Sequence, residues 1–470
     1  MIDSGAVRPP RRIAVIGAGI SGLAAAWTLA AAGESVVVLE TAGQVGGKLR
    51  IESVAGVRVD VGAEAVLARR PEAVGLIAEL GLADEQIAPL TSAALLRVGG
   101  GLHPLPQRTV LGIPADEAAA RASGALTAHA LGRIAAEPNL DPLRPLSHDI
   151  SVGALVRGRL GNEIADRLVE PLLGGVYAGR ADELSLRATV PALATRLGEG
   201  GSLVRAAQAV LEAGPSAATG PIFTSLAGGL GRLPTALAAS GRFDVRTGVT
   251  VRSIRRTATG FLLYCGAVPE PESIEVDGVV IATPAAKAAR LLGEIAPAAA
   301  GDLAGIDSAS VAIVTFAFAG VALPAGSGLL VGAREGLSVK GVTITSQKWS
   351  LDSRGLTVLR ASLGRAGDAQ VLQREDADLI RLARHDMAEM LGLRADPVDA
   401  LVTRWGGGLP QYAVGHIDRI IRVRAAVARV AGLGVCGAAY DGVGIPACIA
   451  SARAAAEQVL TSLERGRMTP

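Results

Sequence analysis

The chain has 470 residues, of which half are apolar, so it can bury the cores of two or three packed units and is not a disordered chain. Its 46 Lys and Arg residues nearly balance its 44 Asp and Glu residues, which gives a formal net charge of +2. The basic residues form no long runs. This spread excludes a nucleic-acid-binding stripe, so an anionic ligand must be bound by local groups.

The cysteines and histidines form no metal-binding pattern. None of the three cysteines has CxxC spacing, and none of the five histidines belongs to an HxxxH or HExxH pair. We therefore predict no catalytic metal and expect a reducing compartment. Residues 1–12 lack the basic and then apolar pattern of a signal peptide, so we expect a cytoplasmic protein.

Two apolar stretches, residues 13–33 and 309–333, approach the length of a membrane span. Glycines interrupt the first, and Pro324 and further glycines interrupt the second, so we interpret both as buried elements of a globular fold. A peripheral contact with a membrane stays open.

Residues 12–40 are predicted to form a strand, a turn, a helix that ends at Gly33, and a second strand. The turn carries the GxGxxG motif Gly17, Gly19 and Gly22, which permits close approach of a pyrophosphate to the first turn of the helix. Glu40 ends the second strand, where a carboxylate can accept hydrogen bonds from ribose hydroxyls. The unit predicts a dinucleotide site, and the alternative is a glycine-rich structural turn.

The rest of the chain alternates between helical and strand patterns. Apolar residues at helical spacing over residues 149–174, interrupted at Gly161, predict a helical subdomain, whereas residues 308–363 are rich in strand patterns. The expected fold class is α/β, with a Rossmann-type dinucleotide-binding domain, which the motifs described next assign to FAD, a mixed-sheet substrate domain and a helical subdomain. The expected boundaries are residues 1–75, 222–290 and 405–470 for the dinucleotide-binding domain, 76–99 and 291–404 for the substrate domain, and 100–221 for the helical subdomain with its connecting segment.

A second glycine pair, Gly46 and Gly47, follows Glu40 and is typical of FAD-binding amine-oxidase-like flavoproteins, whereas NAD proteins generally lack it. Further segments appear in family order between residues 12 and 460. Together they resemble the protoporphyrinogen and coproporphyrinogen oxidase family of haem biosynthesis. The segments are GAGISGLAAAW, VLETAGQVGGKLR, DVGAEAVLARRPEA, VEPLLGGVYAGRADELSL, TSQKW, RWGGGLPQY and YDGVGIPACIASA.

The resemblance implies FAD as the cofactor. It also implies that a helix beginning near Pro446 points its N-terminus at the pyrimidine edge of the flavin, where reduction develops negative charge. The alternative for this tail is a surface helix after an ordinary glycine turn. The residues that match FAD contacts of the family are Gly17, Gly19, Ile20, Ser21, Gly22, Glu40, Gly46, Gly47, Lys48, Gly62, Ala63, Glu64, Val249, Gly437, Val443, Gly444 and Ile445.

For the substrate, the resemblance implies that Arg70 meets a propionate and that Gly175 and Val176 lie over the face of the macrocycle. The alternative for Arg70 is a solvated side chain at a helix start. Further positive charge near the propionates could come from Arg69, Arg180 or Lys348. We expect core packing for the aromatic residues Tyr177, Trp349 and Tyr412 and a structural role for His416.

The implied reaction is the six-electron oxidation of coproporphyrinogen III to coproporphyrin III, with O2 as acceptor and H2O2 as product. Hydride would pass directly to the flavin, so no protein acid or base is named. The alternative substrate is protoporphyrinogen IX. More distant alternatives are an amine oxidase or carotenoid desaturase, and a non-redox binding protein on the same fold. Transient contact with a ferrochelatase stays open.

Overall fold

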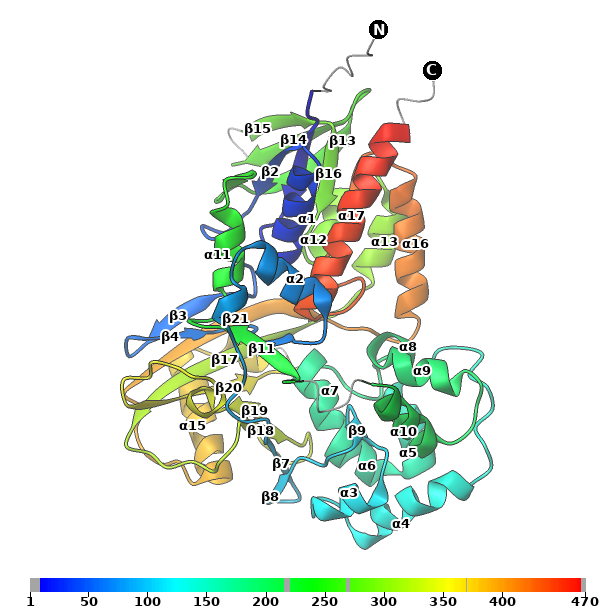
Figure 1. Cartoon of the computed structure of the whole chain (residues 1–470), viewed down its shortest axis with the longest axis vertical. Coiled ribbons are helices and arrows are strands. Elements are labelled where there is room, and N and C mark those ends of the chain that lie inside the picture. Colours follow the sequence, from blue (N-terminus) through cyan, green and yellow to red (C-terminus); the bar gives the residue numbers. More distant parts are fainter. Residues whose placement is uncertain (1–8, 215–219, 268–270, 369, 466–470) are drawn as a thin grey trace.

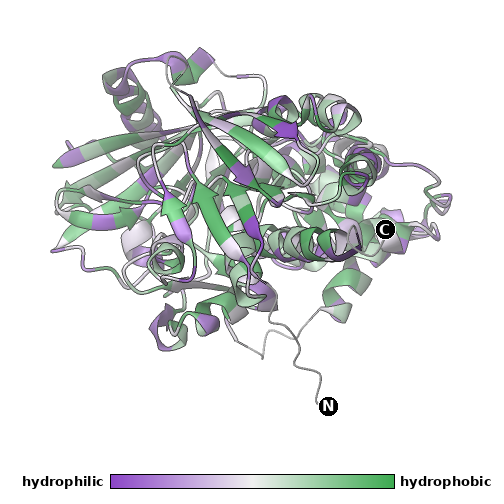
Figure 2. Ribbon diagram, turned by 90° about the horizontal axis from the view of Figure 1, so that it is seen from above, coloured by the Kyte–Doolittle hydropathy of each residue, from purple (hydrophilic) through white to green (hydrophobic). Residues whose placement is uncertain are grey.

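The computed structural model describes residues 9–214, 220–267, 271–368 and 370–465. Figure 1 shows three parts: an α/β part that carries both ends of the described chain, a large sheet with α15 on its outer side, and a group of helices beside that sheet. In Figure 2, hydrophobic residues (green) predominate in the strands and helices that pack together. Hydrophilic residues (purple) lie mainly at strand ends and on the outermost helices.

A five-stranded parallel sheet forms the centre of the α/β part. Its order is β12-β2-β1-β16-β22, so the first strand of the chain lies in the middle. Residues 13–16 are at most 4% exposed because both faces of the sheet are covered. The strands are β1 (Arg12–Ile16), β2 (Ser35–Leu39), β12 (Asp244–Arg246), β16 (Gly278–Ile281) and β22 (Leu433–Val435).

Helices and a small antiparallel sheet cover the two faces of this parallel sheet (Figure 1). On one face, α1 and α17 pack against each other. The elements of this face are α1 (Ile20–Ala31), α2 (Pro71–Glu79), α11 (Arg232–Ala238) and α17 (Ile445–Arg465). The opposite face carries β13 (Val251–Arg256), β14 (Phe261–Gly266), β15 (Pro271–Val276), α12 (Ala285–Leu292), α13 (Pro297–Ala304) and α16 (His416–Ala428).

A seven-stranded sheet of order β21-β17-β20-β19-β18-β7-β8 forms the second part. All neighbouring strands are antiparallel except β18 and β7. One face packs against α15 (Asp376–Leu391), and α7 covers β18 and β19. The strands are β7 (Leu95–Val98), β8 (Gly101–Pro104), β17 (Ser308–Ala319), β18 (Gly328–Val331), β19 (Val339–Thr343), β20 (Leu356–Leu363) and β21 (Asp399–Pro410).

The helical part shares one apolar core, to which Tyr412 also contributes. The predicted interruption at Gly161 is confirmed, because this residue has φ +95° and ends α5. A π-helical turn, Ala165–Val169, then leads into α7. The helices are α3 (Glu117–Ala122), α4 (Ala128–Ala136), α5 (Val152–Leu160), α6 (Asn162–Ile164), α7 (Glu170–Tyr177), α8 (Leu186–Thr189), α9 (Pro191–Leu197) and α10 (Leu203–Ala213).

Short elements connect these parts. The strands pair as β3 (Ile51–Val54) with β4 (Val57–Asp60), β5 (Val66–Leu67) and β6 (Gln86–Ile87) with β11 (Phe223–Leu226), and β9 (Thr109–Val110) with β10 (Ile113–Pro114). The short helices are η1 (Ala83–Glu85), η2 (Glu137–Asn139), α14 (Thr345–Lys348) and η5 (Gln370–Gln373).

The expected fold class is confirmed. The apolar stretch 13–33 contains most of β1 and all of α1, and the stretch 309–333 contains most of β17 and all of β18. Among the described residues, no helix is both long and apolar enough to cross a membrane. The domain boundaries stay a proposal; the one at residue 405 falls inside β21, and the one at residue 99 falls in the hairpin between β7 and β8.

Candidate active site

The glycine turn after β1 leaves one position open for a ligand. Gly17 has φ +105°, and a Cβ atom on Gly22 would overlap the carbonyl oxygen of Gly17, so both positions require glycine. A Cβ atom on Gly19 would meet nothing within 4 Å. Gly19 is also the N-cap of α1, which begins at Ile20, and it offers no side chain to the first amides of the helix. The open N-terminus of α1 fits a pyrophosphate.

Glu40 is fixed beside this turn. Its Oε2 accepts the Ala18 amide at 2.7 Å, and its Oε1 accepts the Ala42 amide at 2.8 Å. Each carboxylate oxygen keeps a further lone pair, so ribose hydroxyls can still bind. The Val249 amide donates to the Glu40 carbonyl at 2.8 Å, which places Val249, another of the predicted FAD contacts, next to the predicted ribose position.

The second glycine pair packs directly on the first motif. The Gly46 amide donates to the Ala18 carbonyl at 2.8 Å, and Gly46 forms a parallel bridge with Gly19. Gly46 and Gly47 have φ values of +109° and +58°, and a Cβ atom on Gly47 would lie 3.3 Å from the Cα atom of Gly19. The two motifs that the sequence singled out therefore form one continuous glycine surface.

Lys48 leads from this surface to the seven-stranded sheet. Its ammonium group donates to the carbonyl of Gly408 on β21, and burial lowers the pKa of Lys48. Gly62 and Ala63 lie beside its backbone, because the Ala63 amide donates to the Lys48 carbonyl at 3.1 Å and a Cβ atom on Gly62 would overlap that same oxygen. This part of the candidate site thus links the α/β part to the seven-stranded sheet.

The Glu64 carboxylate forms two ion pairs. Its Oε1 lies 2.6 Å from Nζ of Lys348, and its Oε2 lies 2.6 Å from Nη1 of Arg360. Arg360 also donates through Nη2 to the Gly62 carbonyl at 2.6 Å. Burial alone would raise the pKa of Glu64, but the charges of Arg360 and Lys348 hold that pKa below its usual value. The carboxylate is therefore ionised and held in place.

Sequence reasoning missed Arg360, although an arginine inside the apolar strand LTVLRASL was a usable signal. It also considered Lys348 as a source of charge for propionates. In the structure, Lys348 instead forms an ion pair with Glu64.

The C-terminal glycine turn lies at the start of α17. Gly437 has φ +134°, and its amide lies 3.3 Å from Oγ of Ser451 on α17. Ile445 is the first residue of α17, and Val443 packs against the core of the helical part. Gly444 precedes Ile445 and accepts the amide of Cys448 at 3.0 Å.

The start of α17 also lies near the two glycine motifs. The Cys448 thiol is close enough to Lys48 and Ser21 for both to lower its pKa, although burial has the larger effect and raises it. The predicted flavin turn and the glycine surface therefore belong to one region of the fold.

The predicted substrate wall is the exposed side of α7. A Cβ atom on Gly175 would lie 3.1 Å from Cδ2 of Leu330 on β18, and Val176 is 43% exposed. Arg70 lies elsewhere, as the N-cap of α2, and donates to Glu72 at 2.7 and 3.1 Å. No described contact joins Arg70 to Gly175 or Val176, so the structure does not gather these three residues into direct contact.

The other candidate cations do not converge on this wall either. Arg180 lies 4.0 Å from Glu183 in an exposed ion pair, and Arg69 is exposed beside Arg70. Within the described ranges, no group of three His, Cys, Asp or Glu side chains is placed to hold a metal ion.

The aromatic residues pack in the interior. The rings of Tyr412 and His416 stack with centroids 4.1 Å apart, and the Tyr412 hydroxyl donates to the Ala438 carbonyl. Burial lowers the pKa of His416 to about 4, so the ring is neutral at pH 7. Tyr177 and Trp349 are 7% and 6% exposed. These placements agree with the expected structural roles.

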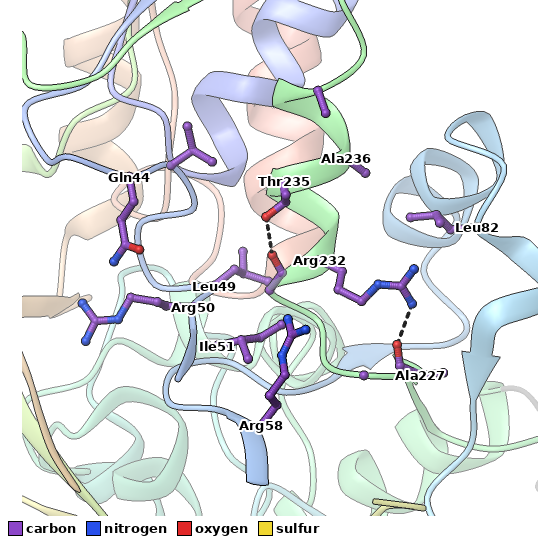
Figure 3. A pocket seen from close by; sticks show the side chains of 14 residues that line it. Gln44, Leu49, Arg50, Ile51, Arg58, Leu82, Ala227, Arg232, Thr235 and Ala236 are labelled. Atoms are coloured by element: carbon purple, nitrogen blue, oxygen red, sulfur yellow. Dashed lines mark hydrogen bonds between the residues drawn. The ribbon is translucent and has the colours of Figure 1, made fainter. Parts of the chain in front are cut away.

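A separate cavity of about 630 Å³ lies between the loop after β2 and α11 (Figure 3). It is lined by Gln44, Arg50, Arg58 and Arg232, and Arg232 donates to the Ala227 carbonyl at 2.6 Å. None of the residues predicted to bind FAD or substrate lines this cavity, so it is not part of the candidate site.

Comparisons with known proteins agree with this geometry. Residues 20–460 match the family model of flavin-containing amine oxidoreductases. A coproporphyrinogen III oxidase of Mycobacterium tuberculosis (strain ATCC 25618 / H37Rv) is 38% identical over 463 residues, covering 97% of this chain and 98% of the relative. A protoporphyrinogen oxidase of Bos taurus is 30% identical over 494 residues, covering 96% and 98%.

A crystal structure from Exiguobacterium sp. 255-15, provisionally assigned as a protoporphyrinogen oxidase, superposes with a TM-score of 0.85. It is 32% identical and covers 97% of this chain and 99% of its own. The family match begins directly after Gly19 and covers Gly22, the pair Gly46 and Gly47, the α7 wall and the turn before α17, which the sequence assigned to cofactor and substrate. The chain belongs to the family of flavin-containing amine oxidoreductases and is an FAD-dependent oxidoreductase.

Proposed function

We propose that this chain is a coproporphyrinogen III oxidase. In the proposed reaction, coproporphyrinogen III loses six electrons and six protons and becomes coproporphyrin III, while three O2 molecules are reduced to three H2O2. The observation that carries the proposal is the packing of Gly46 on Gly19, which forms a surface for FAD, in a chain with near-full-length identity to a coproporphyrinogen III oxidase.

The proposed roles of the residues follow from their placement. When bound, FAD supplies the two-electron acceptor for each of the three oxidation steps. The N-terminus of α1 would hold the pyrophosphate, Glu40 the ribose, and the N-terminus of α17 the pyrimidine edge. Gly175 and Val176, with Leu330 behind them, would form an apolar wall for the macrocycle and exclude water from it.

We assign no acid or base to the protein. His416 is 4% exposed and stacked on Tyr412, and the Tyr177 phenol has a pKa raised to about 12 by burial. Neither side chain is suited to exchange protons with a substrate at neutral pH. The chain then contributes chiefly by positioning the reactants.

The second candidate substrate is protoporphyrinogen IX. The apolar surface offered by Val176, and the 30% identity to a protoporphyrinogen oxidase, favour this macrocycle with fewer propionates. The test compares kcat/KM for the two porphyrinogens under air, by porphyrin fluorescence and by H2O2 formation. The proposal expects the larger value for coproporphyrinogen III with three H2O2 per porphyrin, and a larger value for protoporphyrinogen IX would refute it.

The same purified protein can be used to distinguish the more distant alternative functions from the proposed one. A colourless protein that takes up no flavin on reconstitution would indicate a non-redox binding protein. Oxidation of putrescine or benzylamine without porphyrinogen turnover would indicate an amine oxidase. A cytoplasmic location, a peripheral membrane contact and product transfer to a ferrochelatase are further proposals, which fractionation and co-purification can test.

A further inference from the structure

Two cations beside α7 have no carboxylate partner among the described residues: Lys340, which is buried, and Arg365, which is partly buried. Lys340 on β19 is 5% exposed, yet its side chain takes part in no hydrogen bond and no ion pair within that part of the chain. Arg365, just after β20, donates only to the Val331 carbonyl at 3.1 Å, and no described carboxylate lies within 4.0 Å of its guanidinium. Buried charges are normally paired because desolvation is costly.

The two cations are neighbours on the side of the sheet that α7 covers. Arg365 lies against α7, since a Cβ atom on Gly174 would be 3.1 Å from its Nη1. Arg365 donates to the carbonyl of Val331, the residue after Leu330, and Leu330 pairs with Gly341, the residue after Lys340. Burial and the nearby charge of Arg365 lower the pKa of Lys340 to about 7. The register of β19 and β20 shifts between Val339 and Gly341, so Lys340 occupies a bulge, a feature that redirects a side chain.

The neighbouring residues belong to the proposed substrate wall. Gly341 pairs with Leu330, whose side chain lies under Gly175. On the opposite side of the sheet, Val339 and Val342 are buried under α15. Lys340 and Arg365 therefore lie beside the wall of α7 and away from the apolar core that α15 closes.

Within the described ranges, no acidic side chain forms an ion pair with Lys340 or Arg365. Glu170 and Asp368 influence the pKa of Arg365, but neither comes within 4.0 Å of it, and Glu170 accepts the Ala181 amide at 2.7 Å. Nζ of Lys340 has no described hydrogen-bond partner and is not completely buried, so it keeps some contact with solvent. An anion that enters from outside the chain can reach it.

We propose that Lys340 and Arg365 together bind a propionate carboxylate of the porphyrinogen. The proposal rests on the proposed function and deepens it, because it names the groups that distinguish a tetrapropionate macrocycle from one with fewer carboxylates. The planar guanidinium of Arg365 can offer paired donors, and the Lys340 ammonium adds a second charge.

The test uses the full chain with FAD bound and the variant Lys340→Met, which removes the charge but keeps a long apolar stem. The KM for coproporphyrinogen III should rise about tenfold with little change in kcat, as expected for the loss of one charged hydrogen bond. The KM for protoporphyrinogen IX should change by less than about threefold, because fewer carboxylates need a partner. Lys340→Arg should restore binding.

Lys287→Met is the matched control, since Lys287 is exposed on α12 in the α/β part. A direct measurement follows coproporphyrin III binding by fluorescence, with coproporphyrin tetramethyl ester as the uncharged probe. Lys340→Met should weaken the binding of the acid about tenfold and leave that of the ester unchanged.

Equal affinities of wild type and Lys340→Met for coproporphyrin III would overturn the inference. Loss of FAD or of the fold in Lys340→Met would also overturn it, because an unpaired buried cation should be dispensable for folding. If the wild type binds coproporphyrin III through Lys340 but does not oxidise coproporphyrinogen III, the proposed function fails and the anion site stands.

Discussion

Nζ of Lys348 lies 2.6 Å from Oε1 of Glu64, and this ion pair joins the segment between β4 and β5 to α14. Arg360 binds the other carboxylate oxygen, so one buried acid is held by two cations from elements distant in the sequence. The side chains are only 9–20% exposed, which makes the cluster sensitive to the removal of one member.

Glu64→Gln should lower the free energy of unfolding by about 3 kcal/mol, because it leaves two buried cations without their counter-charge. Urea denaturation of the holoprotein, followed by circular dichroism, measures the change. Glu72→Gln is the control, since it breaks the more exposed pair with Arg70 and should cost less than about 1 kcal/mol. Equal losses in the two variants would contradict the role assigned to Glu64.

Gly22→Ala should abolish FAD binding, because the new methyl group would overlap the Gly17 carbonyl and displace α1 from the turn. The ratio of flavin absorbance to protein absorbance after reconstitution measures this loss. Gly132→Ala, on an exposed face of α4 where a Cβ atom meets nothing within 4 Å, should keep full flavin content. A yellow, fully loaded Gly22→Ala protein would disprove the assignment of the pyrophosphate turn.

His416 should make the fold sensitive to acid. Its pKa is lowered to about 4 in the folded chain, while the unfolded chain keeps a value near 6.5. Protons therefore bind the unfolded state more tightly, so this contribution to stability is complete above pH 6.5 and is lost as the pH falls toward 4. The loss should reach up to about 3 kcal/mol.

His416→Phe keeps the stacking on Tyr412 and removes the proton, so it should lose less stability than the wild type between pH 7.5 and pH 4.5. Urea midpoints at the two pH values measure the difference. His129→Phe, at an exposed position of α4, should behave as the wild type does. An unchanged acid sensitivity in His416→Phe would exclude the burial effect.

Arg70→Ala should raise the KM for coproporphyrinogen III about threefold and leave FAD bound, because Arg70 is partly exposed and must leave Glu72 to meet a propionate. Arg69→Ala is the adjacent control. If both variants keep the KM of the wild type, Arg70 is only a solvated side chain of α2.

The dinucleotide unit could be predicted because its determinants are local. Gly17, Gly19 and Gly22 lie in one turn, and Glu40 ends the next strand, so propensity and spacing suffice to place them. The sequence assigned Gly19 and Gly46 to the same cofactor, and the structure adds that the two residues form a bridge.

The pairing of the buried charges could not be predicted in this way. Lys348 and Arg360 meet Glu64 across nearly 300 positions, and no periodicity in the sequence encodes such a pairing. Lys340 and Arg360 each interrupt an apolar strand, which marks them as unusual but does not say which face of the sheet they occupy. Only the bulge in β19 and the packing of α7 decide that.

The packing of α1 on α17 also bears on how the protein is made in the cell. Ribosomes produce α17 long after α1, so the wall of the candidate cofactor site beside the glycine turn is missing until α17 has left the ribosome. Until then the apolar face of α1 that packs on α17 has no cover, which makes it a site for contacts with other nascent chains. FAD capture therefore has to wait for the synthesis of α17.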